Sequence, residues 1–183
     1  MAEWKTWSLG GASGKEPHGD GGRNEPGRPL PPDAAERWGT EVTPFTLERA
    51  ARVVQGDGFP VTRDEAAIGV LINSLPMRLH REPADAPWAQ FEAHVPLPDG
   101  MDEGAPDPFD LQQTANAWNS QHLQPTVIPA RSDERFFFHL STRFFVGEGL
   151  SDRQIHLMIA RGVVVTLQAA RQLPGLVTPP EDA

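Results

Sequence analysis

The sequence predicts one α+β domain in which an antiparallel sheet of about five strands carries its helices on one face. Helix-like and strand-like segments are grouped along the chain instead of alternating one by one, as in α+β folds. Several strand-like segments have apolar residues at every second position, which is typical of an antiparallel sheet with one buried and one solvated face. The length of 183 residues suits one sizeable core and is too short for two ordinary domains.

The expected element order is a helix, three or four short strands, a second helix, two strands and a long helix. When the first group has three strands, the order is α-β-β-β-α-β-β-α. We expect residues 41–174 to form this domain. Residues 1–40 are expected to be a disordered tail, because Gly, Pro and charged residues dominate positions 10–35 and cannot bury enough apolar surface to offset the chain entropy. Residues 175–183 end the chain in a Pro-rich stretch and are expected to be a flexible tail.

The first helix is predicted within TPFTLERAARVVQGDGF. Thr43 is a candidate N-cap, with Pro44 at the first helical position. One face of this helix is apolar at helical spacing, through Leu47, Ala50, Ala51 and Val54. Gly56 is expected to end the helix in a left-handed conformation.

Between Phe59 and Leu97 the apolar period is close to two. The stretch FPVTRDEAAIGVLI predicts two strands around a polar turn, and MRLHR predicts another strand after the turn residues NSLP. In WAQFEAHVPL, alternate positions are apolar and are expected to face the core: Ala89, Phe91, Ala93 and Val95.

A second helix is expected over Pro108 to Ser120, followed by a hairpin made of PTVIPAR and RFFFHLSTRFFV. The buried face of this helix is predicted to consist of Leu111, Ala115 and Trp118. Pro129 cannot donate a ladder hydrogen bond, so its strand is expected at an edge or with a local irregularity.

The junction between the second helix and this hairpin contains Trp118, Asn119 and His122, residue types found both in active sites and in structural joints. A structural joint is favoured. Trp118 continues the apolar helix face and needs only one carbonyl for its ring N–H. Asn119 can bond the last helical carbonyls or adopt a left-handed turn, and His122 has no acid or base partner nearby in the sequence.

Ser151 and Gln154 predict a capping box at the start of a last helix, which runs to about Leu173 before Pro174 and Gly175. This helix has more apolar surface than one sheet requires. The surplus apolar side chains are Leu157, Val164 and Val165. They predict a homodimer interface, unless a terminal segment of the chain covers them. The segment is interrupted by polar residues and falls short of the ~20 apolar residues of a membrane span.

Composition excludes several classes of function. The chain contains no cysteine, which rules out disulfides, thiolate metal sites and cysteine nucleophiles. A net charge of −9 without a basic block disfavours nucleic-acid binding. No apolar run follows Lys5, so no secretory signal is expected and the predicted location is the cytoplasm.

No motif predicts a catalytic residue, a cofactor or a metal. The six histidines lack metal-ligand spacing and are expected on the solvated surface, with His156 able to pair with Asp152 one turn away. The carboxylates between Asp99 and Asp110 lack the spacing of a calcium loop, so a solvated acidic loop is favoured over a cation site. Nucleophile-elbow and phosphate-loop motifs are absent, and GEGLS at Gly147 is read as a turn before Ser151.

Three stretches of the chain resemble the YbjN-type domain. They are NAWNSQH at the end of the second helix, PTVIPAR at the next strand and GLSDRQIHLMI at the last helix. The resemblance covers about Glu41 to Leu173, and Asn116, Trp118 and Asn119 are its most specific part. It implies the fold of a family described as bacterial sensory transduction regulators and similar to class I type III secretion chaperones. It also implies a dimeric binding scaffold without catalytic residues.

The leading functional hypothesis is therefore a non-enzymatic cytoplasmic module that binds a protein segment. An extended or amphipathic peptide would dock on its exposed sheet or helix surface. One alternative is a regulatory domain that acts through homodimerisation alone. An uncharacterised enzyme is a further alternative, although no constellation of residues supports it.

Overall fold

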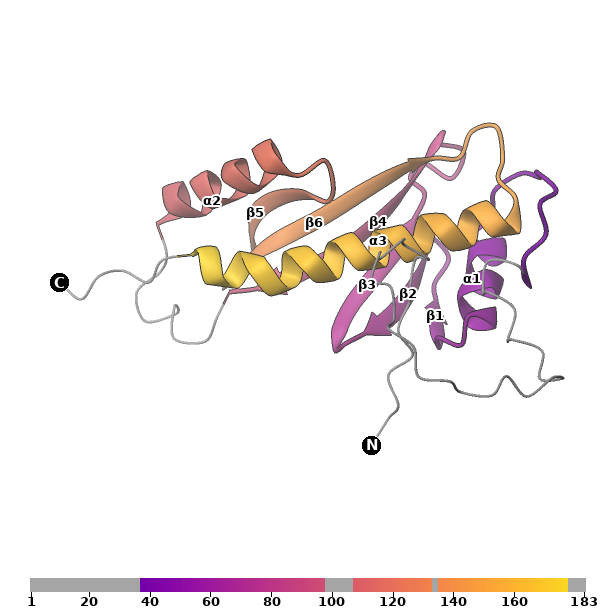
Figure 1. Ribbon diagram of the computed structural model, residues 1–183, viewed down its shortest axis with the longest axis horizontal. Helices are drawn as coiled ribbons and strands as arrows, with labels where there is room; N and C mark the ends of the chain where they lie inside the picture. The colour runs from indigo at the N-terminus through magenta and orange to yellow at the C-terminus, as the bar shows by residue number, and fades with distance from the viewer. Residues whose placement is uncertain (1–36, 98–106, 133–134, 178–183) are drawn as a thin grey trace, which may run out of the picture.

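The computed structural model describes residues 37–97, 107–132 and 135–177. Along the chain lie α1 (Leu47–Gly56), β1 (Val61–Arg63), β2 (Ala67–Ile72), β3 (Leu75–His80), β4 (Trp88–Pro96), α2 (Pro108–Gln121), β5 (Thr126–Ser132), β6 (Arg135–Phe145) and α3 (Asp152–Gln172) (Figure 1). A 3₁₀ turn, Leu173–Leu176, follows α3. The predictions for residues 1–36, residues 178–183 and most of the acidic loop concern positions outside the described residues.

The predicted α+β class with an antiparallel sheet is confirmed. The strands form one sheet in the order β1-β2-β3-β4-β6-β5, and every neighbouring pair is antiparallel. The sheet has six strands in place of about five, because the three-residue β1 pairs with β2. The hairpin between β5 and β6 is present as predicted, and β5, which contains Pro129, is an edge strand.

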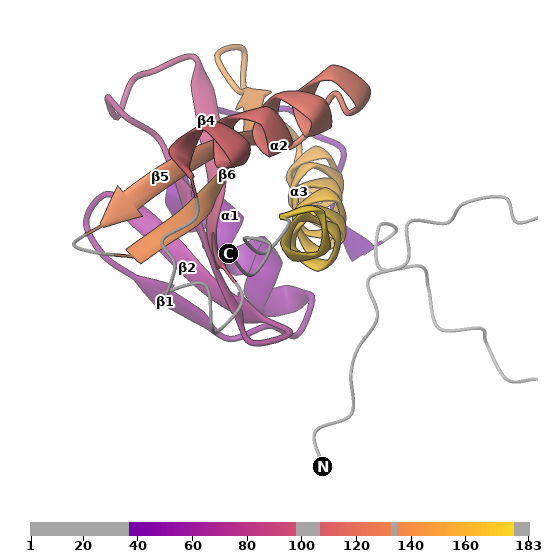
Figure 2. The ribbon, with the colours of Figure 1, turned by 90° about the vertical axis from the view of Figure 1, so that its left-hand side faces the viewer.

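All three α-helices of the described chain pack on one face of the sheet. Helix α3 crosses the strands, with α1 near its N-terminal end and α2 near its C-terminal end (Figure 1). Seen nearly along α3, the strands lie to one side of it and α2 crosses above (Figure 2). Two core clusters fill the layer between helices and sheet, one centred on Phe91 and Ile159 and the other on Trp118 and Phe138.

The first helix begins later than predicted. Its N-cap is Thr46, whose hydroxyl accepts a hydrogen bond from the Arg49 amide at 3.1 Å. Thr43 is extended instead, because its backbone pairs with Leu150 just before α3. The left-handed residue after the helix is Gly58, with φ of 90°, and not Gly56. The tertiary pairing of residue 43 thus overrides a cap that the local sequence favours.

The alternating pattern of the strands is confirmed. In β4, buried side chains alternate with more exposed ones, and the buried set is the predicted one: Ala89, Phe91, Ala93 and Val95. The turn from β2 to β3 consists of Asn73 and Ser74, both with positive φ. Such a two-residue turn matches the twist of an antiparallel hairpin.

The junction after α2 is the predicted structural joint. Trp118 is 3% exposed, and its Nε1 donates to the Pro125 carbonyl at 3.2 Å. The His122 ring stacks on it with centroids 3.7 Å apart. Asn119 has a different partner from the one expected. Its Nδ2 donates a hydrogen bond to the Val127 carbonyl in β5, and its Oδ1 accepts one from the Val127 amide, both at 2.8 Å. Asn119 thereby joins α2 to the edge strand.

Both boundaries of the packed domain lie outside the predicted ones. The Trp38 ring contacts the end of α1, and its Nε1 donates to Asp57 at 3.1 Å. Val177 is buried in the second core cluster beside Leu173. Packed residues therefore occur outside 41–174, from Trp38 at one end to Val177 at the other, and the predictions for the chain beyond them lie outside the described residues.

The capping box at the start of α3 is confirmed. The Ser151 hydroxyl accepts from the Gln154 amide, and the Gln154 side chain accepts from the Ser151 amide. Among the described residues no helix combines the length and apolarity needed to cross a membrane.

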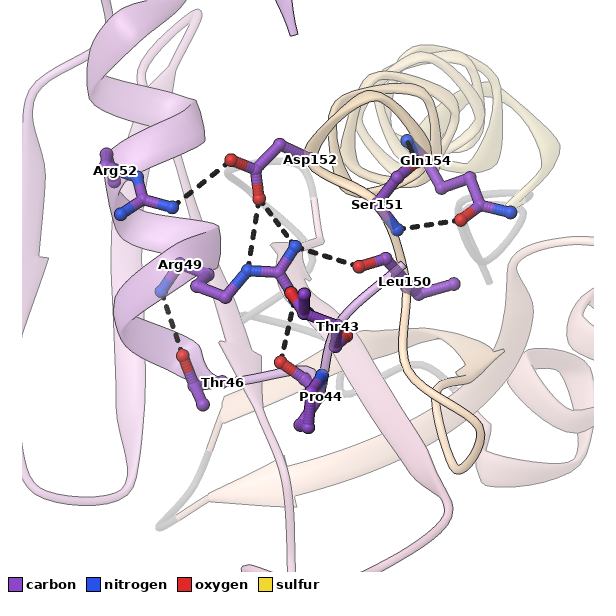
Figure 3. A network of polar contacts seen from close by, with 9 residues as sticks. All are labelled: Thr43, Pro44, Thr46, Arg49, Arg52, Leu150, Ser151, Asp152 and Gln154. Atoms are coloured by element: carbon purple, nitrogen blue, oxygen red, sulfur yellow. Dashed lines mark hydrogen bonds and ion pairs between the residues drawn. The ribbon is translucent and has the colours of Figure 1, made fainter. Parts of the chain in front are cut away.

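Helix α1 is joined to the start of α3 by the Arg49 side chain (Figure 3). The guanidinium donates to Asp152 Oδ1 from Nε and Nη2, at 3.1 and 2.6 Å. It also donates to the carbonyls of Thr43, Pro44 and Leu150 at 2.7 to 2.9 Å. All five N–H donors of the guanidinium are therefore used. Arg52 adds an ion pair to Asp152 Oδ2 at 3.2 Å, from a largely exposed position.

We expect Arg49→Ala to lower the free energy of unfolding by about 3–5 kcal/mol, because it leaves a mostly buried carboxylate and three carbonyls without their shared donor. The matched control is Arg52→Ala, which removes an exposed partner of the same carboxylate and should cost no more than about 1 kcal/mol. Urea unfolding followed by tryptophan fluorescence measures both. Equal losses for the two variants would contradict this role of Arg49.

Candidate functional site: the open face of the sheet

The candidate site is the face of the sheet that points away from the helices, called here the open face. Because side chains alternate along a strand, the residues between the buried positions of β4 and β6 all point to this side. The register places Trp88 opposite Phe145, Gln90 opposite Arg143, and His94 opposite His139. From β3, Arg78 lies opposite Glu92 and His80 opposite Gln90. The open face therefore brings together side chains from three adjacent strands.

A polar network occupies the centre of the open face. His80 Nε2 lies 3.1 Å from Glu92 Oε2, and His139 Nε2 lies 3.5 Å from Glu92 Oε1. The Gln90 side-chain amide donates to Glu92, and the Gln90 oxygen accepts from Arg143 Nε at 2.9 Å. His94 Nε2 lies 3.1 Å from His139 Nδ1, so one of these nitrogens donates and the other accepts. The Glu92 carboxylate is thus the common partner of two histidines and a glutamine.

The network is partly withdrawn from solvent although it lies on an uncovered face. The side chains of His80, Glu92 and His139 are only 13%, 17% and 22% exposed, respectively. Burial alone raises the pKa of Glu92, but hydrogen bonds from His80 and Gln90 and the charges of His80 and His139 outweigh it and hold that pKa below its ordinary value.

The pKa of His139 is lowered. The largest cause is burial, which disfavours the imidazolium. Glu92 acts in the opposite direction and raises this pKa, whereas the neighbouring charges of His94 and His80 lower it further. A proton on His139 is therefore disfavoured both by burial and by positive charge on the neighbouring histidines.

The expectation of solvated histidines was wrong for several positions. His80 and His139 are partly buried in this network, and His156 is buried beside Asp57, with Nδ1 2.8 Å from Oδ2. Asp152, the partner expected for His156, forms ion pairs with Arg49 and Arg52. The sequence did contain one signal for the network. His80, Glu92, His94 and His139 all fall on the polar phase of their strands, but only the strand register brings them together.

Aromatic and aliphatic side chains flank the polar network. Trp88 and Phe145 are 51% and 58% exposed and form an edge-to-face pair with centroids 6.3 Å apart. Ile128 in β5 and Leu71 in β2 are also exposed. By the strand register both point to the open face, beside His139 and Pro76, respectively. The open face thus combines apolar contact area with charged and polar groups.

A shallow hollow of about 590 Å³ lies beside the network, between β1 and β4. Its lining includes Asp64, Gly69, Arg78, Glu92 and His94. A Cβ atom built on Gly69 would approach Thr62 Oγ1 to 2.6 Å, so the absence of a side chain there helps to keep the hollow open. Arg78 lies 3.6 Å from Asp64 at the rim.

The carboxylates of the open face and of the described part of the acidic loop have partners within the fold. Across the described residues, no group of three or more His, Asp or Glu side chains is arranged to hold a metal ion. The Glu92 oxygens are already engaged by His80, His139 and Gln90. The described part of the acidic loop also has a structural task, since the Asp107 carboxylate caps α2 by accepting from the Phe109 amide at 2.9 Å.

The predicted dimer-interface residues lie on α3, away from the open face. Leu157 is 40% exposed, whereas Val164 and Val165 are half-buried. The exposed positions near them include Arg161 and Gln168, and Arg161 donates to the Gln124 side chain at 3.2 Å. The apolar surplus on this helix is therefore smaller than the sequence pattern predicts.

Comparison with known proteins identifies the fold. No protein-family model matches the sequence, and no curated protein matches it at a significant level. Among solved structures, the chain is similar to YbjN from E. coli, provisionally described as a transcription regulator. The identity is 10% and the TM-score 0.57, over 74% of this chain and 93% of that one. It is also similar to an uncharacterised protein from Methanothermobacter thermautotrophicus, at 14% identity and a TM-score of 0.50, over 72% and 99% of the two chains.

The chain therefore has a YbjN-like fold, as the resemblance of the sequence implied. At these identities the similarity concerns the fold alone, because one fold supports many unrelated functions.

The lowered pKa of His139 predicts a pH-dependent stability. A histidine whose folded pKa lies below its ordinary value of 6.5 stabilises the fold at higher pH, and this contribution is lost as the pH falls from that value through the folded pKa. We expect the melting temperature to drop between pH 7.5 and about 5.5, and to drop less in His139→Gln. Differential scanning calorimetry across this range provides the measurement. An identical drop in both proteins would show that His139 is not responsible.

Proposed function

We propose that the protein is a non-enzymatic protein-binding module of the YbjN type, with a chaperone-like or regulatory role, and that it docks a partner protein on the open face. The observation that carries the proposal is the one-sided placement of the helices. Because α1, α2 and α3 pack on the same face of the sheet, Trp88, Phe145 and Ile128 remain exposed on the other face.

Leaving the paired rings of Trp88 and Phe145 in water is unfavourable, and exposed apolar patches tend to mark interaction sites. Aromatic side chains also contribute much of the binding energy at protein interfaces. Trp88 and Phe145 therefore are suitable anchors for a partner. The fold similarity to a provisionally described regulator is compatible with this role.

A non-enzymatic role is proposed because the one carboxylate of the open face, Glu92, is already engaged by neighbouring side chains. Gln90 and Arg143 complete the network around Glu92, whereas general acid–base chemistry requires a group free to reach a substrate proton. The absence of cysteine fits a reducing compartment, and the cytoplasm is the proposed location.

The docking proposal predicts that a partner is lost when the aromatic pair is removed. Tagged wild-type protein and the variant Trp88→Ala/Phe145→Ala are compared as baits in lysate, with captured proteins identified by mass spectrometry. The matched control is Phe109→Ala/Leu123→Ala, which removes two exposed apolar side chains outside the sheet. We expect the wild type and the control to retain a partner that the aromatic-pair variant loses while its melting temperature is maintained. Equal capture by all three baits would refute docking on the open face.

A second candidate function, regulation through homodimerisation alone, is favoured by the exposed Leu157 on α3. It predicts that Leu157, Val164 and Val165 lie at a two-fold contact between copies of the chain. Sedimentation of the wild type should then give a dimer at tens of micromolar, and Leu157→Glu/Val164→Glu should give a folded monomer. A wild type that sediments as a monomer at that concentration would eliminate this candidate.

A further inference from the structure

The six strands carry an unusual balance of charge for this protein. The whole chain has a net charge of −9. The strands, in contrast, contain a single carboxylate, Glu92, together with five arginines and three histidines: Arg63, Arg78, Arg131, Arg135, Arg143, His80, His94 and His139. The other acidic residues in the described part of the chain lie on helices, turns and loops. The sheet is therefore the cation-rich part of an acidic molecule.

Most of these cations are on the open face. Arg78 and Arg143 are exposed there, and the strand pairing directs Arg135 and all three histidines to the same side. The one carboxylate, Glu92, is already shared between His80, His139 and Gln90. Among the described residues, the ion pair of Arg78 is a 3.6 Å contact with the exposed Asp64. Additional carboxylates from a partner would therefore meet cations that the fold leaves incompletely neutralised.

The apolar groups of the open face fall within reach of the same partner. The Trp88–Phe145 pair and the His94–His139 pair are six residues apart along β4 and β6, which is about 20 Å at the rise of a strand. An extended segment of about six or more residues spans this distance. Its apolar side chains would contact Trp88 and Phe145, and its carboxylates would lie near Arg143, Arg78 and the histidines.

We propose that the open face binds an acidic polypeptide segment that also carries apolar or aromatic anchors, and that it binds this segment more tightly as the histidines become protonated. This inference rests on the docking role proposed above and specifies the chemistry of the partner. A peptide fits better than a nucleic acid, because a short acidic segment needs few cations, whereas a phosphate backbone requires many.

The pH dependence follows from the groups around the histidines. His80, His94 and His139 face Glu92 and Gln90 of β4, Arg78 of β3 and Arg143 of β6. Positive charge on these histidines adds to that of Arg78 and Arg143, against the single negative charge of Glu92. A bound carboxylate stabilises these protons, so by linkage its affinity rises as the pH falls.

The test uses the full chain and two fluorescently labelled peptides of the same length. One contains Glu and Asp interspersed with Leu and Phe, and in the other Lys replaces every acidic residue. Fluorescence anisotropy at pH 6 and low salt should give an affinity for the acidic peptide about tenfold or more above that for the basic one, with a loss of affinity as salt is added.

Charge reversal locates the binding site. Arg78→Glu/Arg143→Glu should weaken binding of the acidic peptide about tenfold or more, because both cations lie on the proposed path. The matched control is Arg153→Glu/Arg171→Glu, which makes the same change in net charge at exposed positions of α3 and should change the affinity no more than about twofold. If the first variant has a lowered melting temperature, Arg78→Gln/Arg143→Gln provides the milder comparison.

The pH dependence of peptide binding tests the contribution of the histidines. Between pH 7.5 and 5.5, with a chelator present, the wild type should bind the acidic peptide about threefold to tenfold more tightly at the lower pH. His94→Gln/His139→Gln should show less than half of this change in the logarithm of the affinity. Affinity that is independent of pH in the wild type would remove the histidines from the proposal.

Three results would overturn the inference: equal binding of the basic peptide, no binding of the acidic one, or tighter binding of a single-stranded oligonucleotide. These results can be told apart from a failure of the proposal that the open face is a docking surface. If Trp88→Ala/Phe145→Ala still loses a captured partner while the acidic peptide does not bind, the open face remains a docking surface and only the acidic partner is excluded.

Discussion

The arrangement of the molecule depends on the Arg49 guanidinium, which joins parts of the chain that are about a hundred residues apart. Its bonds to Asp152 and to the Leu150 carbonyl join α1 to the start of α3 (Figure 3). Its bonds to the carbonyls of Thr43 and Pro44 fix the strand-like entry to α1. Lysine has neither the planar fork nor the number of donors to satisfy this set. The first and last helices are therefore fixed to each other as well as to the sheet.

The contacts of Arg49 contribute to the difference between the two faces of the sheet. With α1 held at one end of α3, and α2 joined to β5 by Asn119, the helices all remain on the same face. The opposite face keeps aromatic, cationic and histidine side chains in contact with solvent. A sheet face without a helical cover is a natural place for recognition, because its side chains are held rigidly by neighbouring strands.

The polar network on the open face also explains why that face tolerates charge at its centre. Glu92 would be costly to bury alone, but His80, His139 and Gln90 supply donors to its two oxygens. The network keeps the carboxylate ionised and at the same time makes the surrounding charge sensitive to pH. The similarity to YbjN concerns the backbone arrangement, so the functional argument depends on these side chains and not on the shared fold.

The sequence by itself determined the fold class, the positions of most elements and the joint at Trp118, because these depend on periodicity and on local capping such as that of Ser151 by Gln154. It did not determine the start of α1, where the pairing of Thr43 with Leu150 displaced a good local cap. It also did not reveal the partner of His156 or the network around Glu92. Several of these contacts join residues far apart in the chain, such as His156 with Asp57 and His94 with His139. A one-residue change in strand register would send the network side chains to the other face. Only the tertiary structure, through that register, decided which polar residues meet.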